Sequence, residues 1–434
     1  MSNIENTDVN SAEERYVVIS SDGHCGGEIH EYKGYLAREW HDEFEAWAAT
    51  YKSPFADTVS ETGKRNWDSD FRTAEMNADG IAGEVLFPNT IPPFFETVGI
   101  IGIGLPTNET SLKRRWSGLQ AHNRWLVDFC SREPDRRRGI IQVFPNDVEL
   151  AVAEIEWASE QSVLGGVLLP AIPPNHATQP YFHRRYEPIW RICEERDFAV
   201  CHHSGSGIPD MPWSEPGGMS IMEFESPLWT KRTMSHLILG GVFERFPALK
   251  YAQTEMGGLQ WVADTGFALD FSVAQQVGKG NRTRTLFTDE TTRGLSLKPS
   301  EYIRRNVYHG ASVMAPHDVE FLSELGIDRV MWGSDYPHES CSTPQSSEAL
   351  RWAMAGLPDA DCRQLLAGTA ADVYKFDVAA LGALSLGPTK SQLHTPLHGP
   401  DITERQRRMQ TSGTGDRAIR PFKGGVLLAR PSLV

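Results

Sequence analysis

Residues 330–338 of this sequence join an apolar run to two groups that can do chemistry. The apolar, partly β-branched residues 330–332 are typical of a strand buried on both faces. Asp335 follows a Gly-Ser pair, the Tyr336-Pro337 pair prevents the strand from continuing, and His338 comes within one turn. A carboxylate and an imidazole are costly to bury at a strand end unless something pairs with them. A metal ion would be such a partner, and a helix cap or a salt bridge is the simpler alternative.

Three further predicted strands end in groups of the same kind. Asp22 and His24 follow a strand near residue 16, and because they are two residues apart, an extended backbone points them to the same side. His202 and His203 follow a strand near residue 198, and Glu255 follows a strand near residue 249. This repeated placement favours one shared site over several unrelated caps.

The strands that position these residues alternate with helical stretches along the chain. Eight predicted strands begin near residues 16, 83, 139, 165, 198, 249, 307 and 330. A strand–helix rhythm of this count favours a closed parallel (β/α)8 TIM barrel over a doubly wound sheet. Functional groups of such a barrel lie at the carboxyl ends of its strands. The candidates there are Asp22, His24, His202, His203, Glu255, His309 and Asp335.

The remaining segments are predicted to extend this barrel. Residues 1–14 are polar and acidic, which is typical of a flexible N-terminal tail. Residues 15–376 form the predicted barrel domain, with insertions after the first and fifth strands at residues 30–70 and 211–225. Residues 377–434 are rich in Gly, Pro and Thr but end in an apolar stretch. They are predicted to form an extended C-terminal arm that packs on a partner subunit.

Composition narrows the classes of partner. The 434 residues carry a net charge of -15, which argues against general binding to nucleic acid or to an anionic membrane surface. No run is apolar enough to span a membrane, and the first residues do not resemble a signal peptide. The six cysteines show no CxxC pairing, which is typical of reduced thiols. These features predict a soluble cytoplasmic protein that acts on a small molecule.

The sequence contains Asp-x-His at Asp22, His-Ser-Gly at His203 and Gly-Ser-Asp-Tyr-Pro-His around Asp335. Through these motifs, residues 16–376 resemble the amidohydrolase superfamily. The chain looks most like its branch of metal-dependent decarboxylases of aromatic acids. The resemblance implies one or two divalent metal ions (Zn, Mn or Fe) at the barrel mouth. It assigns metal binding to Asp22, His24, His203 and Asp335, and it makes Asp335 the proton acceptor in catalysis.

One position departs from the superfamily pattern. Where many members have Thr-His-x-Gly-Gly after the sixth strand, residues 254–258 are Thr-Glu-Met-Gly-Gly, so an anion replaces an imidazole. Glu255 is therefore a further candidate for metal binding and for catalysis. His202, His338 and His309 are candidates for a second metal or for hydrogen bonds to the ligands. For His309 the alternative is a core histidine bonded to backbone.

Three functions follow from this reasoning. The first is metal-activated hydrolysis or decarboxylation of a small organic acid, amide or ester, in which the metal lowers the pKa of a bound water toward ~7 or holds a substrate carboxylate. If Glu255 binds metal, the carboxylate-rich set suits iron or manganese, and a dinuclear non-heme iron monooxygenase acting on a small carboxylate is the alternative. A non-catalytic barrel subunit is the third. A homo-oligomer, or a hetero-oligomer with a related subunit, is expected.

Overall fold

The computed structural model describes residues 14–53, 61–95, 104–174, 176–209, 211, 214–277 and 290–395. Eight parallel strands pair in chain order in one sheet, which confirms the predicted (β/α)8 barrel. The strands are β1 (Ile19–Cys25), β2 (Gly83–Pro88), β3 (Arg137–Gln142), β4 (Leu164–Leu168), β5 (Ala199–His203), β6 (Tyr251–Thr254), β7 (Val307–Ser312) and β8 (Val330–Gly333). Backbone bonds join the residues after β8 to β1, from Asp335 N to Asp22 O at 2.9 Å and from His24 N to Tyr336 O at 2.7 Å.

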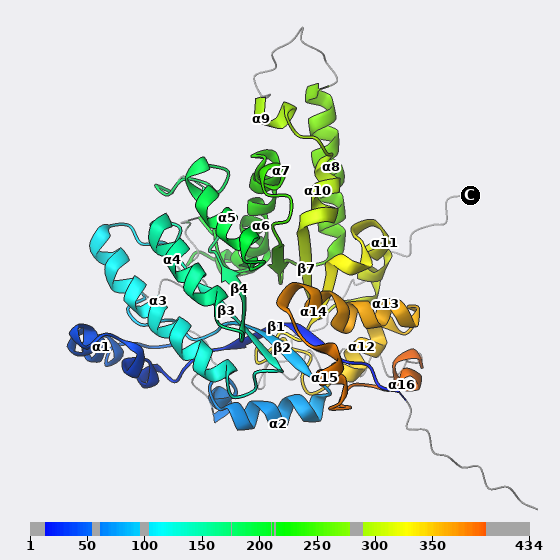
Figure 1. Ribbon diagram of the computed structural model, residues 1–434, viewed down its shortest axis with the longest axis horizontal. Helices are drawn as coiled ribbons and strands as arrows, with labels where there is room; N and C mark the ends of the chain where they lie inside the picture. The colour runs from blue at the N-terminus through cyan, green and yellow to red at the C-terminus, as the bar shows by residue number, and fades with distance from the viewer. Residues whose placement is uncertain are drawn as a thin grey trace, which may run out of the picture. The chain divides into compact units, whose positions relative to one another are not determined.

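Helices surround these strands (Figure 1). The longer ones are α1 (His41–Ala48), α2 (Ser69–Asp79), α3 (Glu109–Cys130), α4 (Val148–Ser159), α5 (Glu187–Glu195), α6 (Gly218–Leu239), α8 (Leu259–Val277), α10 (Pro299–Asn306) and α12 (Ser346–Met354). Shorter ones are α7 (Val242–Arg245), α9 (Glu290–Arg293), α11 (Leu322–Leu325), α13 (Asp359–Arg363), α14 (Thr369–Tyr374), α15 (Val378–Gly382) and α16 (Lys390–His394). Side-chain caps begin several of them, for example Asp68 at α2 and Asp147 at α4.

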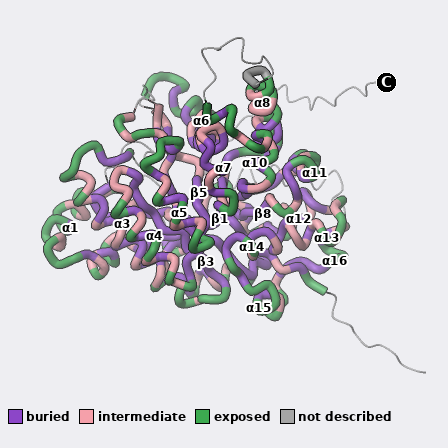
Figure 2. Tube along the Cα trace, turned by 45° about the horizontal axis from the view of Figure 1, so that its top comes forward, coloured by how far each residue is buried: buried purple, intermediate pink, exposed green. Residues whose placement is uncertain are grey.

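Each strand buries both of its faces, as expected for a parallel sheet inside a layer of helices (Figure 2). One face fills the barrel with small and apolar residues such as Val85 and Met331, and Tyr374 from α14 packs into the same cluster. The opposite face packs against the helices and includes Tyr251 and Trp332. Polar residues on either face are therefore buried, and only their partners distinguish structural from functional groups.

Two predicted boundaries differ from the structure. The first strand was predicted near residues 16–20, but β1 begins at Ile19 and runs to Cys25. Asp22 and His24 therefore lie within the strand, where the pairing to β2 is irregular between Ser20 and Gly23. The predicted insertion at residues 211–225 already contains the start of α6, which includes Pro227. A proline inside the helical pattern conceals such a helix from sequence reading.

The C-terminal region divides into a described and an undescribed part. Residues 377–395, which we expected to belong to an arm, pack on the chain's own N-terminal segment through Tyr16 N to Pro388 O at 3.0 Å and Arg15 Nη1 to Gly387 O at 2.7 Å. Leu381 of α15 is buried in this contact region. The rest of the predicted arm, from residue 396 to 434, and the predicted tail over residues 1–13 lie outside the described residues. Among the described helices, none is both long and apolar enough to cross a membrane.

Candidate metal centre

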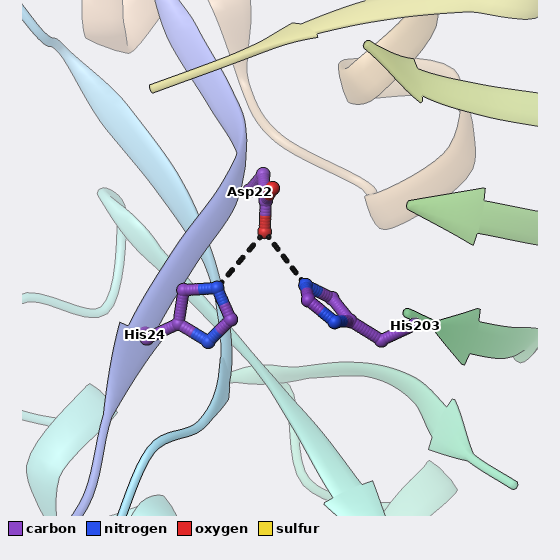
Figure 3. A group of neighbouring side chains, drawn as sticks. All are labelled: Asp22, His24 and His203. Carbon is purple, nitrogen blue, oxygen red and sulfur yellow. Dashed lines mark hydrogen bonds and ion pairs between the residues drawn. The ribbon is translucent and has the colours of Figure 1, made fainter. Parts of the chain in front are cut away.

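Strands β1 and β5 bring three candidate ligands together at the barrel mouth (Figure 3). Asp22 and His24 point to the same side of β1, as their spacing predicts. The Nε2 atoms of His24 and His203 each lie 3.2 Å from Asp22 Oδ1. Asp22 is fully buried and His24 is 3% exposed. The carboxylate therefore lies between two imidazoles in a site from which most solvent is excluded.

The segment after β8 adds a second group around the same histidine. Asp335 lies in the left-handed region, with φ of 61°, which turns its carboxylate into the mouth. Its Oδ1 is 3.3 Å from His24 Nε2 and 2.7 Å from His338 Nδ1. The sets Asp22, His24, His203 and His24, Asp335, His338 each gather ligand atoms within 4.8 Å of one another.

His24 provides the test of whether these residues fit a metal ion. Its ring is buried, yet neither nitrogen makes a well-formed hydrogen bond to any residue that the structure describes. Nε2 is close to two carboxylates but poorly directed toward them. A cation shared between imidazole and carboxylate ligands would give His24 Nε2 and both neighbouring carboxylates a partner at once. The residues present therefore fit a divalent metal ion.

The charges of the cluster stabilise one another. Burial opposes ionisation of Asp22, but the neighbouring His203 and His24 hold its pKa well below the usual range. Burial likewise opposes charge on His24, but the nearby carboxylates of Asp22 and Asp335 raise its pKa to about 10. Burial acts to raise the pKa of Asp335, but the neighbouring His24 and His338 lower it to about 2. A metal ion would replace the histidine proton in this arrangement, because a ligating imidazole is neutral.

Glu255 lies beside this cluster rather than at its centre. It follows β6 with φ of 57°, and its side chain is 35% exposed toward the mouth. Ser204 Oγ donates to Glu255 Oε2 at 2.7 Å, and His203 Nδ1 lies 3.5 Å from the same oxygen. Burial raises the pKa of Glu255, and the negative charges of Asp335 and Asp22 raise it further. The neighbouring His203 acts in the opposite direction.

Two candidate histidines lie on the other side of the barrel wall. The ring of His202 packs between Tyr181 and Tyr251, with ring centres 5.5 and 5.3 Å away, and burial lowers its pKa to about 3. His309 Nδ1 accepts a hydrogen bond from Gln253 Nε2 at 3.0 Å, and burial lowers its pKa to about 3 as well. Because side chains alternate along a strand, His202 and His203 face opposite ways. The structure does not bring His202 or His309 to the cluster, whereas His338 is part of it.

Sequence reasoning missed three residues that hold the ligands in place. Ser312 Oγ at the end of β7 donates to Asp22 Oδ2, and Ser340 Oγ donates to Asp335 Oδ2 at 3.0 Å. Asn89 Oδ1 accepts from His338 Nε2 at 3.2 Å. Asn89 directly follows β2, so the strand-end rule that identified the other residues would have found it. Nothing in the local sequence marks the two serines.

A cavity opens between the segments that follow β1 and β2. Its volume is about 370 Å³, and its lining residues are Gly27, Glu28, Ile29, Tyr51, Lys52, Ser53, Trp67 and Thr90. Gly27 lies three residues after His24, and Thr90 adjoins Asn89. Cavities of a few hundred Å³ lined by aromatic and a few polar groups are typical of small-molecule sites.

Comparison with known proteins bears on the family and the fold of this chain. The family profile described as "Amidohydrolase" matches residues 107–376, which is more than half of the chain. The chain is 22% identical over 266 residues to a gamma-resorcylate decarboxylase from Polaromonas sp. (strain JS666 / ATCC BAA-500), covering 59% of this chain and 75% of that protein.

Solved structures show the same fold. A 5-carboxyvanillate decarboxylase from Sphingomonas paucimobilis aligns with a TM-score of 0.62 at 19% identity, covering 83% of this chain and 100% of the other. A mutant of the enzyme of that name from Novosphingobium aromaticivorans DSM 12444, with bound manganese and 3-methoxy-4-hydroxy-5-nitrobenzoic acid, aligns with a TM-score of 0.60 at 20% identity, covering 83% and 97%. At these identities the likeness establishes the fold. With the profile match over more than half of its length, this chain belongs to the amidohydrolase family.

Proposed function

We propose that this protein is a metal-dependent decarboxylase of a small aromatic acid. The observation that carries the proposal is the convergence of Asp22, His24, His203 and Asp335, with the buried ring of His24 lacking a well-formed hydrogen bond to any described residue. Decarboxylation is preferred to hydrolysis of an amide or ester because the relatives reported above are decarboxylases of aromatic acids. Those relatives lend no support to the monooxygenase alternative or to a non-catalytic barrel.

Each residue of the cluster has a role in this proposal. Asp22, His24, His203 and Asp335 would hold a divalent ion, and Glu255 lies close enough to His203 to adjust that ligand. When bound, the ion would hold the substrate carboxylate and a neighbouring oxygen. The Asp335 carboxylate, hydrogen-bonded to His338 at 2.7 Å, is placed to relay a proton from that histidine to the substrate. The bond from ring carbon to carboxylate breaks, its electron pair stays on the ring carbon, that carbon takes the proton, and carbon dioxide leaves.

Manganese is the first ion to test. A mixed imidazole and carboxylate set is compatible with manganese, iron or zinc, so the ligands alone do not choose among them. The related structure from Novosphingobium holds manganese. The aromatic acids named for the relatives define the substrate class to screen.

The experiment is a turnover assay on the metal-loaded protein. Purified chain is reconstituted with Mn²⁺, its metal content is measured, and release of carbon dioxide from gamma-resorcylate and from 5-carboxyvanillate is followed. We expect turnover that is lost after chelation and regained with Mn²⁺, and that falls by about 10²- to 10⁴-fold in Asp335→Asn. Protein that holds about one equivalent of metal but releases no carbon dioxide from any of a panel of hydroxylated aromatic acids would contradict the proposal.

A further inference from the structure

A buried lysine lies where the exits of β5 and β6 meet. Lys231 is on α6 and is 5% exposed. The preceding residue, Thr230, donates through Oγ1 to Ser206 O at 2.7 Å, and Ser206 is three residues beyond His203. On the other side, the Lys231 Nζ atom lies 3.7 Å from the position that a Cβ on Gly257 would occupy. Lys231 therefore contacts the loop that carries Glu255, at the mouth of the barrel.

The ammonium of Lys231 lacks an anionic partner within the described part of the chain. Its Nζ lies 4.1 Å from the ring centre of Trp261, at the start of α8, in a cation–π contact. No hydrogen bond or ion pair to a described residue accompanies this contact. Burial lowers the pKa of Lys231 to about 8. The stem of the side chain is buried, whereas the ammonium is only partly shielded and stays within reach of an incoming ligand. A partly shielded cation without an anion beside it can take its counter-charge from such a ligand.

The charge of the mouth indicates what that ligand is. Asp22, Glu255 and Asp335 place three carboxylates around the cluster, and Glu255 faces the opening. One divalent ion offsets two of these charges, so an incoming acid would still meet an anion at the rim. A cation on the same side as Glu255 offsets the remaining repulsion and gives the acid a second point of attachment.

We propose that Lys231 is a substrate-binding residue that holds an anionic oxygen of the aromatic acid on the β6 side of the metal centre. The proposal rests on the function proposed above. The anionic oxygen belongs either to a carboxylate or to an ionised ring hydroxyl. Two acids separate the second carboxylate from the groups that both substrates share, because 5-carboxyvanillate carries two carboxylates and gamma-resorcylate carries one.

The test compares the Mn²⁺-loaded wild type with Lys231→Met and Lys231→Arg. Equilibrium binding of both acids, KM, kcat, metal content and Tm are measured for each protein. We expect Lys231→Met to raise Kd and KM about 10- to 100-fold, the range for losing a hydrogen bond to a charged group. We expect kcat and metal content of Lys231→Met to stay within about threefold of the wild type. Lys231→Arg should recover most of the binding because it restores the positive charge. A lysine with a purely structural role would show no such dependence of binding on charge.

Lys250→Met is the matched control. It removes the same charge at the opposite end of β6, where Lys250 Nζ pairs with Asp197 Oδ1 at 2.7 Å, and it should leave Kd and KM unchanged. Weaker binding of both acids in Lys231→Met would show that Lys231 holds a group common to both. Weaker binding of 5-carboxyvanillate alone would assign it to the second carboxylate. Either result supports the proposal, and unchanged Kd for both acids overturns it.

Failure of this inference can be told apart from failure of the proposed function. If the wild type binds the acids without turning them over, decarboxylation is wrong, and the loss of binding in Lys231→Met still supports the lysine. If the wild type turns them over and Lys231→Met binds them equally well, only the lysine proposal fails. A wild type that binds neither acid overturns both. Should Lys231→Met lower Tm strongly, Lys231→Gln, which keeps a polar end, replaces it in the same comparison.

Discussion

Asp22 and Glu84 are buried carboxylates on neighbouring strands, and their surroundings differ. Glu84 on β2 faces the helices, where Arg72 donates three hydrogen bonds to it at 2.7–3.0 Å and Arg137 a fourth at 3.2 Å. Asp22 on β1 faces the barrel mouth, where its Oδ1 has two imidazoles at 3.2 Å. The Glu84 carboxylate is paired with arginines of the protein itself, whereas the Asp22 carboxylate lies among imidazoles in a cluster that fits a divalent cation.

The same contrast between the outer layer and the barrel mouth applies to two adjacent residues of β5. His202 lies in the outer layer, where burial lowers its pKa to about 3 and keeps it neutral. His203 lies in the mouth, where burial acts against protonation but Asp22 raises its pKa. Residue type and burial alone therefore do not identify a functional histidine. The charge of the neighbouring groups does.

The largest expected effect is a loss of reaction rate when a carboxylate at the barrel mouth is replaced. Asp335→Asn removes the charge of a proposed metal ligand and proton carrier while keeping the side-chain shape. We expect the rate to fall by about 10²- to 10⁴-fold, with a Tm close to that of the wild type. Steady-state kinetics and thermal melting of the metal-loaded proteins check this, and a rate within tenfold of the wild type would remove Asp335 from the mechanism.

The corresponding change in the outer layer should affect stability instead. Glu84→Gln leaves Arg72 and Arg137 buried without a counter-charge, and we expect the free energy of unfolding to drop by about 3–5 kcal/mol. Urea unfolding measures this, with Glu156→Gln as a control because its pair with Arg196 is exposed. The folded fraction should keep the kcat of the wild type. A loss below about 1 kcal/mol would mean that the outer network is not needed for stability.

Glu255 lies between these extremes, at the edge of the mouth. Removing its charge by Glu255→Gln changes the group beside His203, and we expect metal affinity or rate to fall by about 10- to 100-fold. Metal titration and kinetics together test this. If both are unchanged, Glu255 neither binds the metal nor orients its ligand.

The smallest expected effect concerns pH and the neutral histidines of the outer layer. Burial lowers the pKa values of His122 and His309 to about 3, so between about pH 6.5 and 3 the unfolded chain binds protons that the folded chain does not. Stability is therefore lost as pH falls, by about 1.4 kcal/mol per histidine for each unit below about 6.5. Urea unfolding at pH 7 and pH 5.5 checks this. His122→Phe should show a shallower pH dependence, and an equal one would contradict the assignment.

Much of the site could be predicted because parallel barrels place strand ends together. Asp22, His24, His203 and Asp335 each come from a strand or its exit, and closure of the barrel brings them within contact distance. The rule that site residues follow strand ends also applies to Asn89 after β2, which was not among the predicted site residues. It fails for His309, since a residue's position along a strand does not state which face it occupies when both faces are buried.

The sequence by itself determined the eight-stranded rhythm, the barrel class and the candidate ligands, because apolar periodicity and strand-end chemistry are local properties of the chain. Tertiary structure alone decided that β1 extends to Cys25, that His203 rather than His202 faces the mouth, and that Ser312 supports Asp22. It also decided that Lys231 of α6 meets the loop after β6. These facts depend on register, side-chain direction and the packing of distant segments, which residue spacing along one chain does not encode.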